Sequence, residues 1–119
     1  MLFHSTRGND SGKDFATILM QGLADDGGLF MPDHWPQVDL EEIKSKSSFI
    51  DVAKYIVPLF TSSSFTEAET IKIVEDTWHD FEHSDLIGIQ TFEDVSILEL
   101  FHGPTAAFND YGLQLASSY

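Results

Sequence analysis

The sequence predicts an α+β fold, a small domain rich in helix with short strands near both ends of the chain. Apolar residues recur at helical spacing after several helix-capping residues, and runs of β-forming residues stand at the start of the chain and between Leu86 and Phe101. The length of 119 residues fits one core, and 42% hydrophobic and 13% aromatic residues exceed what a disordered chain carries. We therefore expect one folded unit.

The first expected elements are a strand and a helix. Leu2 to Thr6 have β character and run into the turn-prone sequence RGNDSG, which predicts a strand. Ser11 stands three residues before Asp14 in a capping-box-like arrangement, and apolar residues follow on one helical face, which predicts a helix from about 12 to 23. The sequence DDGG then indicates a tight turn into an extended segment at Leu29 to Met31.

Two helices are expected in the middle of the chain. Asp39 with Glu42 predicts a short helix through about Ser45. Ser48 with Asp51 predicts a second helix, which Pro58 should end or kink because proline has no backbone N–H.

The clearest capping box is formed by Thr66 and Glu69. Apolar residues follow it at steps of three and four, which predicts a helix to about Glu82 with these residues facing inward: Ile71, Val74, Trp78 and Phe81.

The last part of the chain contains two β-rich runs, a turn and a final helix. The runs are Leu86 to Phe92 and Val95 to Phe101, and Gly103-Pro104 marks the turn. A helix is expected from Asp110 to Ser118, with Asn109 or Asp110 as its cap.

The charge of the chain excludes several classes of partner. Six basic residues stand against 20 acidic ones, for a net charge of −14, so neither nucleic acid nor an anionic membrane surface is an expected partner. All six cations precede Ile73, whereas Ile73 to Tyr119 contains nine acids. There is no cysteine, no leader-like N-terminus and no apolar run near the ~20 residues of a membrane helix, so we expect a cytoplasmic protein.

Histidines are the strongest candidates for a metal or acid–base site. His79 and His83 are four apart and could share a helical face, but Asp80 follows the first one where a zinc motif has Glu, and no third ligand is evident. Two surface histidines near a helix C-terminus explain the pair better, so no metal site is predicted. His102 could be an acid or base, a ligand contact or a core histidine bonded to backbone, and the last is favoured.

Neither the DDGG sequence nor the serine-rich run TSSS at 61–64 is predicted to be a site. Flanking carboxylates argue against phosphate at the glycines, so a structural turn is expected there. No histidine or carboxylate stands at a spacing that would activate a serine in the TSSS run, which is interpreted as a loop.

Three separated segments resemble threonine synthase. They are HSTRG at His4 to Gly8, GLADDGGLFMP at Gly22 to Pro32, and LELFHGPTAAFNDYGLQL at Leu98 to Leu115. Their order and separations also fit the family, which has the tryptophan-synthase-β-like fold and binds pyridoxal phosphate. The resemblance implies a threonine-synthase-like N-terminal domain over residues 1–100 and the start of a truncated pyridoxal-phosphate domain over residues 101–119.

The resemblance also implies a reaction, and one residue departs from it. The family converts O-phosphohomoserine and water to threonine and phosphate, through an internal aldimine with the lysine of a motif ELFHGPTxAFKD. Asn109 occupies the lysine position, and an amide nitrogen is neither basic nor nucleophilic. The last lysine in the chain is Lys72. Asn109 therefore marks a cofactor position only, no catalytic residue is competent, and no pyridoxal phosphate is expected to be bound to this chain.

Three hypotheses follow from the resemblance. The first is the N-terminal portion of a threonine-synthase-like protein, present as a fragment, a truncated product or a degenerate paralogue and inactive by itself, because the family enzyme continues for some hundreds of residues. The second is a non-catalytic module that binds a partner chain or self-associates through the surface that the missing cofactor domain would cover. The third, pairing with a separately encoded cofactor domain, ranks last because the lysine would still be absent. The surface in the second hypothesis consists of Phe101, Phe108, Tyr111, Leu113 and Leu115.

Overall fold

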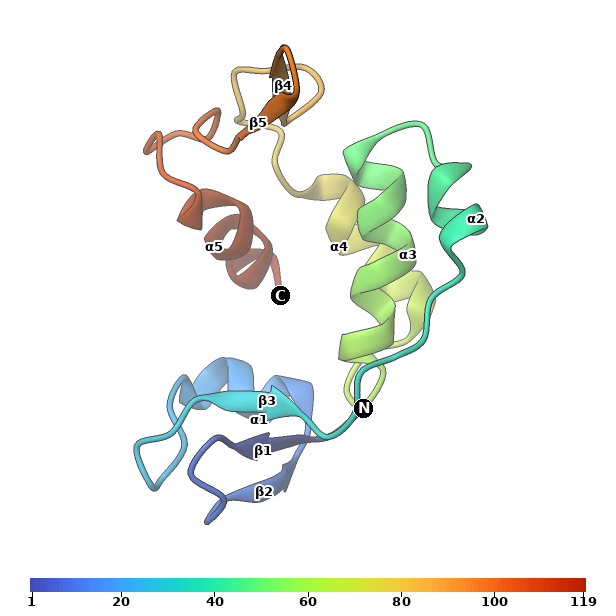
Figure 1. Ribbon diagram of the computed structural model, residues 1–119. Helices are drawn as coiled ribbons and strands as arrows, with labels where there is room; N and C mark the ends of the chain where they lie inside the picture. Colours follow the sequence, from blue (N-terminus) through green and yellow to red (C-terminus); the bar gives the residue numbers. More distant parts are fainter.

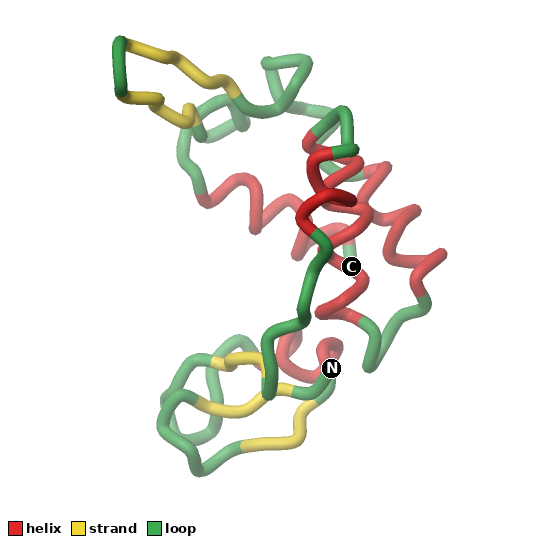
Figure 2. The backbone as a smooth tube through the Cα atoms, turned by 45° about the vertical axis from the view of Figure 1, so that its right-hand side comes forward, coloured by secondary structure: helices red, strands yellow, loops and turns green.

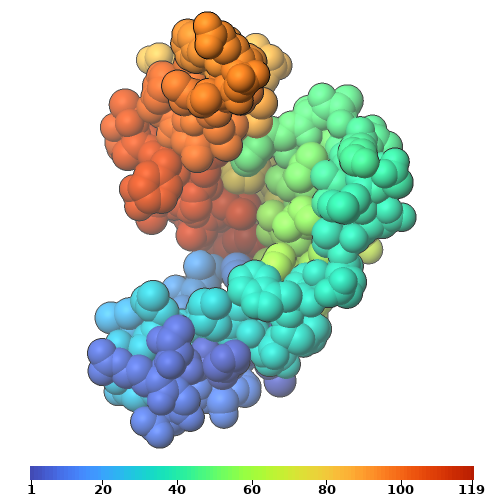
Figure 3. Space-filling view, in the orientation of Figure 1, coloured from blue at the N-terminus to red at the C-terminus, as the bar shows by residue number.

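The computed structural model describes residues 1–119 and has the predicted α+β composition, with five helices and two small sheets (Figure 1). The molecule is elongated, with extents of 46 × 30 × 27 Å, and the space-filling view divides it into an N-terminal lobe and a larger remainder (Figure 3). Along the chain the elements are β1 (Phe3–Ser5), β2 (Ser11–Lys13), α1 (Phe15–Gln21), β3 (Phe30–Pro32), α2 (Leu40–Lys44), α3 (Phe49–Thr61), α4 (Glu67–Asp76), β4 (Gly88–Phe92), β5 (Val95–Glu99) and α5 (Asn109–Ser118).

The N-terminal lobe is a three-stranded antiparallel sheet of order β2-β1-β3 with α1 beside it. The strand predicted at the start of the chain and the extended segment that became β3 are both present. The predicted cap of α1 was wrong: Asp14, not Ser11, accepts a hydrogen bond from Thr17 N. Ser11 cannot start the helix because Ser11–Lys13 pairs with β1 as a strand.

The middle helices begin where the sequence predicts. Asp39 caps α2, and Ser48 caps α3 by accepting from Asp51 N. However, α3 does not end at Pro58 but continues to Thr61. Proline removes a single N–H from the helix, and packing of α3 along α4 offsets that loss.

The capping box of α4 is present, but the helix is shorter than predicted. Thr66 and Glu69 bond each other's backbone N–H groups, and α4 then ends at Asp76, six residues before Glu82. Thr77 is extended, and Trp78 has a left-handed φ of 63°. The Trp78 indole donates to Tyr111 O at 2.9 Å, so a contact with α5 overrides the helical period of the sequence.

The core lies between α3, the end of α4 and α5. Its buried members are Ala53, Val74, Trp78 and Leu86, and the half-buried side chains packed on them are Phe49, Ile50, Val57, Phe81, Tyr111 and Leu115. A second, aromatic cluster links the N-terminal lobe to the helices through Phe3, Phe15, Phe65 and Tyr119. Only 15 of 119 residues are buried, so many large apolar side chains remain uncovered.

The β-rich runs form a two-stranded antiparallel hairpin that stands apart from the helices (Figure 2). Its turn is Glu93-Asp94, and α5 follows after an irregular loop. The predicted cap of α5 was wrong, because Phe108 is the N-cap and no side chain caps this helix. None of the helices has both the length and the apolar character needed to span a membrane.

Candidate functional site

The loop before α5 is held by Asp110, which lies in the first turn of that helix. Its carboxylate accepts from Thr105 N at 2.8 Å and from Thr105 Oγ1 at 2.6 Å. The Thr105 hydroxyl bond lowers the pKa of Asp110 below the ordinary carboxyl value, and backbone N–H donors add to the effect. Because Asp110 is only 2% exposed, it fixes the loop to the helix from inside and is not available as a surface cap.

Gly103 fits this loop because there is no room for a side chain. A Cβ built on it would lie 2.5 Å from Cβ and Oδ2 of Asp110, closer than real Cβ contacts. Ala106 closes the turn with a bond from its N–H to Gly103 O at 3.0 Å and has a left-handed φ of 55°. The Gly-Pro turn predicted from the sequence is therefore present, and Asp110 is the contact that the sequence did not reveal.

His102 is half-buried and bonds to a carboxylate. Its Nε2 lies 3.1 Å from Glu99 Oε2, and its ring centroid is 4.6 Å from that of His83. The favoured interpretation, a histidine whose ring bonds to backbone, was therefore wrong about the partner: the backbone contact is made by His102 O, which accepts from Glu82 N.

Asn109 is the first residue of α5 and is exposed. Its side chain makes no hydrogen bond, so no contact of the loop depends on it. The loop therefore presents position 109 at the solvent-exposed start of a helix, where an amide side chain offers no basic nitrogen.

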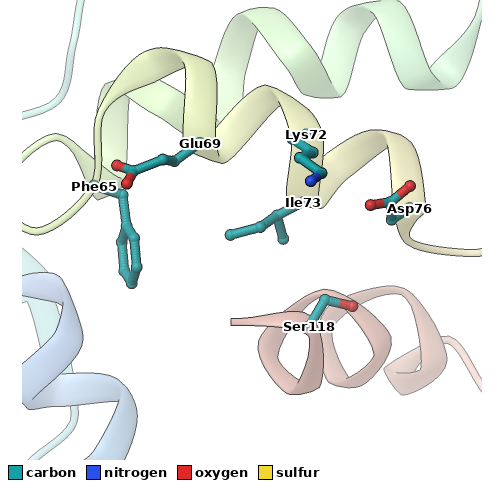
Figure 4. A pocket seen from close by; sticks show the side chains of 6 residues that line it. All are labelled: Phe65, Glu69, Lys72, Ile73, Asp76 and Ser118. Atoms are coloured by element: carbon teal, nitrogen blue, oxygen red, sulfur yellow. The ribbon is translucent and has the colours of Figure 1, made fainter.

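Lys72, the last lysine of the chain, lies far from Asn109. It lines an open cleft of about 360 Å³ between α4 and the far end of α5, together with Phe65, Glu69, Ile73, Asp76 and Ser118 (Figure 4). Ser118 is nine residues beyond Asn109, so the helical rise places this cleft about 14 Å along the axis from Asn109. A lysine side chain is shorter than half that distance.

The two N-terminal segments singled out from the sequence meet at Asp26. Its carboxylate accepts from Ser5 Oγ at 2.6 Å, Gly28 N at 2.9 Å and Asn9 N at 3.0 Å. These bonds lower the pKa of Asp26, the Ser5 hydroxyl having the largest effect. The HSTRG and DDGG segments thus form one hydrogen-bonded structural unit, as the turn interpretation of DDGG predicts.

The serine-rich run has a structural role that the sequence did not indicate. Ser63 Oγ accepts from Phe15 N at 3.0 Å, and Ser64 Oγ accepts from Ala16 N at 2.9 Å. Two N–H groups in the first turn of α1 are therefore satisfied by residues 48 positions away. Thr61, interpreted as part of the loop, is instead buried at the end of α3 and bonds Thr70.

His79 and His83 do not share a helical face, because α4 ends at Asp76, before both residues. His79 bonds Asp76 O and lies near Asp80, whereas His83 packs on His102. No three histidine or carboxylate side chains of residues 1–119 are grouped so that they could hold a metal ion.

The five residues expected at an interaction surface divide into two groups. Phe101, Phe108 and Leu113 are 54–68% exposed. Tyr111 and Leu115 face the core instead, and the Tyr111 hydroxyl donates to Leu86 O at 2.6 Å. Burial raises the pKa of that hydroxyl above its ordinary value, and the Asp110 charge adds to the shift.

Residues 2–78 match the family model described as the threonine synthase N terminus. The threonine synthase of Pseudomonas aeruginosa is 38% identical over 118 residues, which are 97% of this chain and 25% of that protein. This chain belongs to the threonine synthase family. It spans about a quarter of the length of the family members it matches.

Solved structures of threonine synthase share the fold of the chain. The Brucella melitensis enzyme with bound pyridoxal phosphate superposes with a TM-score of 0.88 at 36% identity, over 99% of this chain and 26% of that one. The yeast threonine synthase gives 0.82 at 33% identity, over 98% and 25% of the two chains. Both the resemblance stated from the three segments and the predicted fold class are therefore confirmed.

Proposed function

We propose that this chain acts as the N-terminal portion of a threonine-synthase-type protein and forms no aldimine with pyridoxal phosphate by itself. In this proposal the family reaction, O-phosphohomoserine and water to threonine and phosphate, belongs to the longer protein. Residues 1–100 act as the N-terminal domain and residues 101–119 as the start of the cofactor domain. A cytoplasmic location belongs to the same proposal.

The proposal is supported chiefly by the chemistry of Asn109. An aldimine requires a primary amine that can be deprotonated, and the exposed amide at the start of α5 has none. The region that would receive an anionic cofactor also lacks lysine and arginine from Ile73 onwards. The residues around Asn109 therefore do not fit the cofactor, although the loop that presents this position is held by Asp110 and Gly103.

The test is borohydride reduction in the presence of pyridoxal phosphate, followed by peptide mass spectrometry. Lysines before residue 73 react non-specifically with pyridoxal phosphate, so the informative measurement is whether a peptide from the region Ile73 to Tyr119 carries an adduct. We expect no adduct there in the natural chain, whereas Asn109→Lys should give one and thereby show that this peptide is detected. An adduct in that region of the natural chain would overturn the proposal.

A second candidate function is a non-catalytic interaction module. It is favoured by the exposed apolar residues of the hairpin and of the loop after it, which exceed the single scattered side chains that a monomer normally exposes. Sedimentation across a hundredfold dilution, alone and with a partner, tests it. A chain that remains a monomer and binds nothing would exclude this function without affecting the aldimine result.

A further inference from the structure

The bond between Asp26 and Gly27 is the only place in the chain where an aspartate precedes a glycine. In this dipeptide the glycine nitrogen can attack Cγ of the aspartate, because glycine has no side chain to obstruct the approach. A succinimide ring forms, and the N–H proton leaves with the carboxyl hydroxyl as water. Water then opens the ring: addition at the side-chain carbonyl restores aspartate, whereas addition at the main-chain carbonyl leaves isoaspartate. No other reactant is needed.

The peptide group that would react is hydrogen-bonded through both of its polar atoms. Gly27 N donates to Ala24 O at 2.8 Å, and Asp26 O accepts from Arg7 Nη1 at 3.1 Å. The attacking nitrogen must give up its proton, so its bond to Ala24 has to break first. Any rotation of the peptide group toward the carboxyl also breaks the bond to Arg7. The fold therefore keeps the nucleophile engaged elsewhere.

The carboxylate of Asp26 is bonded at both oxygens. Oδ1 accepts from Ser5 Oγ at 2.6 Å and from Gly28 N at 2.9 Å, and Oδ2 accepts from Asn9 N at 3.0 Å. These bonds favour the charged form and hold the pKa of Asp26 below its ordinary value, with the Ser5 hydroxyl as the largest cause. Only a protonated carboxyl can release its hydroxyl as water, so the same bonds also remove the leaving group.

Ser5 links the parts of this unit from inside. It is 1% exposed, and its hydroxyl donates to Asp26 while it accepts from Arg7 N at 3.1 Å. One side chain thus holds the carboxylate and also the residue whose guanidinium bonds Asp26 O. Every contact that closes the Asp26–Gly27 bond lies between Ser5 and Gly28, so the closure does not depend on any other part of the protein.

We propose that Asp26–Gly27 is a latent site of isoaspartate formation, which the fold keeps closed and which the Ser5 hydroxyl controls. Isoaspartate carries one more carbon in the main chain, and it turns the main-chain carbonyl that accepts from Arg7 into a free carboxylate. The modification would therefore break the hydrogen-bonded unit that joins the two N-terminal family segments. The inference concerns the chemistry of the chain itself and stands apart from both candidate functions.

The first experiment compares isoaspartate formation in the folded and the unfolded chain. The chain is kept at 37 °C near pH 6, in buffer and in concentrated guanidinium chloride, and samples are digested with trypsin. Electron-transfer fragmentation of the peptide Asp14–Lys44 locates isoaspartate at position 26, although its mass equals that of aspartate. We expect a rate at least about tenfold lower in buffer, because reaction there requires local opening. Equal rates, or no isoaspartate in either condition, would overturn the proposal.

Matched variants test the role of Ser5. Ser5→Ala should raise the rate in buffer at least about threefold, because it removes the closest donor to the carboxylate. It should leave the rate in guanidinium chloride unchanged. The control is Thr6→Ala, which removes another bond of the same unit, from Leu29 N to Thr6 Oγ1 at 3.1 Å, but none to Asp26. Its rate in buffer should equal that of the natural chain.

Amide hydrogen exchange separates this role from a general loss of structure. Asp33 N donates to Leu2 O at 2.9 Å at the opposite end of β1, so its exchange reports opening of the N-terminal lobe. We expect Ser5→Ala to react faster while its Asp33 amide stays as protected as in Thr6→Ala. A rise in rate that both variants share, or that matches the loss of protection at Asp33, would overturn the control by Ser5.

Discussion

Trp78 is the side chain whose removal should cost this fold the most. It is 5% exposed, meets Phe49 edge-to-face at 5.0 Å and donates its indole N–H to Tyr111 O. These contacts join α3, the end of α4 and α5. Trp78→Ala deletes all of them, whereas the backbone strain of the left-handed φ stays the same because alanine also has a Cβ.

The size of the loss follows from these contacts. Truncation of a buried tryptophan costs roughly 3–5 kcal/mol, of which the lost hydrogen bond accounts for about 1 kcal/mol. A domain of this kind is stabilised by about 5–15 kcal/mol in total. With an m-value of about 2 kcal/mol per molar urea, the midpoint of unfolding should fall by roughly 2 M.

The assay is urea unfolding followed by far-ultraviolet circular dichroism, with Trp35→Ala as the matched control. Trp35 is 63% exposed and has a single aromatic neighbour, Phe60, at 6.1 Å. Its truncation should cost less than about 1 kcal/mol, since little buried surface is lost. Equal shifts of the midpoint in the two variants would refute the placement of Trp78 in the core.

Three further predictions concern single side chains, each checked by the urea midpoint. Tyr119→Phe should stabilise the chain by about 1 kcal/mol, because the Tyr119 hydroxyl is buried without a partner; a lower midpoint would contradict this. The pKa of Asp26 is lower in the folded chain than in the unfolded chain, where an aspartate has a pKa of about 3.9. Its carboxylate therefore stabilises the fold above that pH, and this contribution is lost as the pH falls through the lower pKa of the folded state. Asp26→Asn should therefore lose less stability between pH 7 and 3 than the natural chain, and an equal loss in the two would contradict this. Gly103→Ala should destabilise by roughly 1–3 kcal/mol through overpacking, whereas Gly112→Ala, with open space around it in a helix, should stabilise by up to about 1 kcal/mol; the reverse order would be incompatible with the loop geometry.

Elements with a local cause could be predicted from the sequence. The capping side chains of Asp39, Ser48 and Thr66 each bond a backbone N–H no more than three residues later. Both partners of each bond therefore stand within one short stretch of sequence, where the pattern can be recognised. The three family segments could likewise be identified from their residues alone, and the match to the threonine synthase family confirms them.

Elements decided by distant contacts could not be predicted. The end of α4 depends on a bond from Trp78 to Tyr111, which is 33 residues away, and the start of α1 depends on Ser63 and Ser64. The hydrophobic period continued through Phe81 and therefore predicted six residues of helix too many. For the same reason Tyr111 was expected on a surface, although its ring packs between Phe49 and Phe81.

The loop before α5 keeps its shape independently of the side chain at position 109. The loop before α5 is shaped by Gly103, Thr105 and Asp110, and none of the bonds that define it involves the side chain at 109. A substitution at an exposed residue that makes no contact costs little stability. Under the proposal that Asn109 stands where the family motif has lysine, the chain can carry asparagine there and still fold the same loop. The shape of the loop then says nothing about whether an amine is present, because the identity of residue 109 alone decides that.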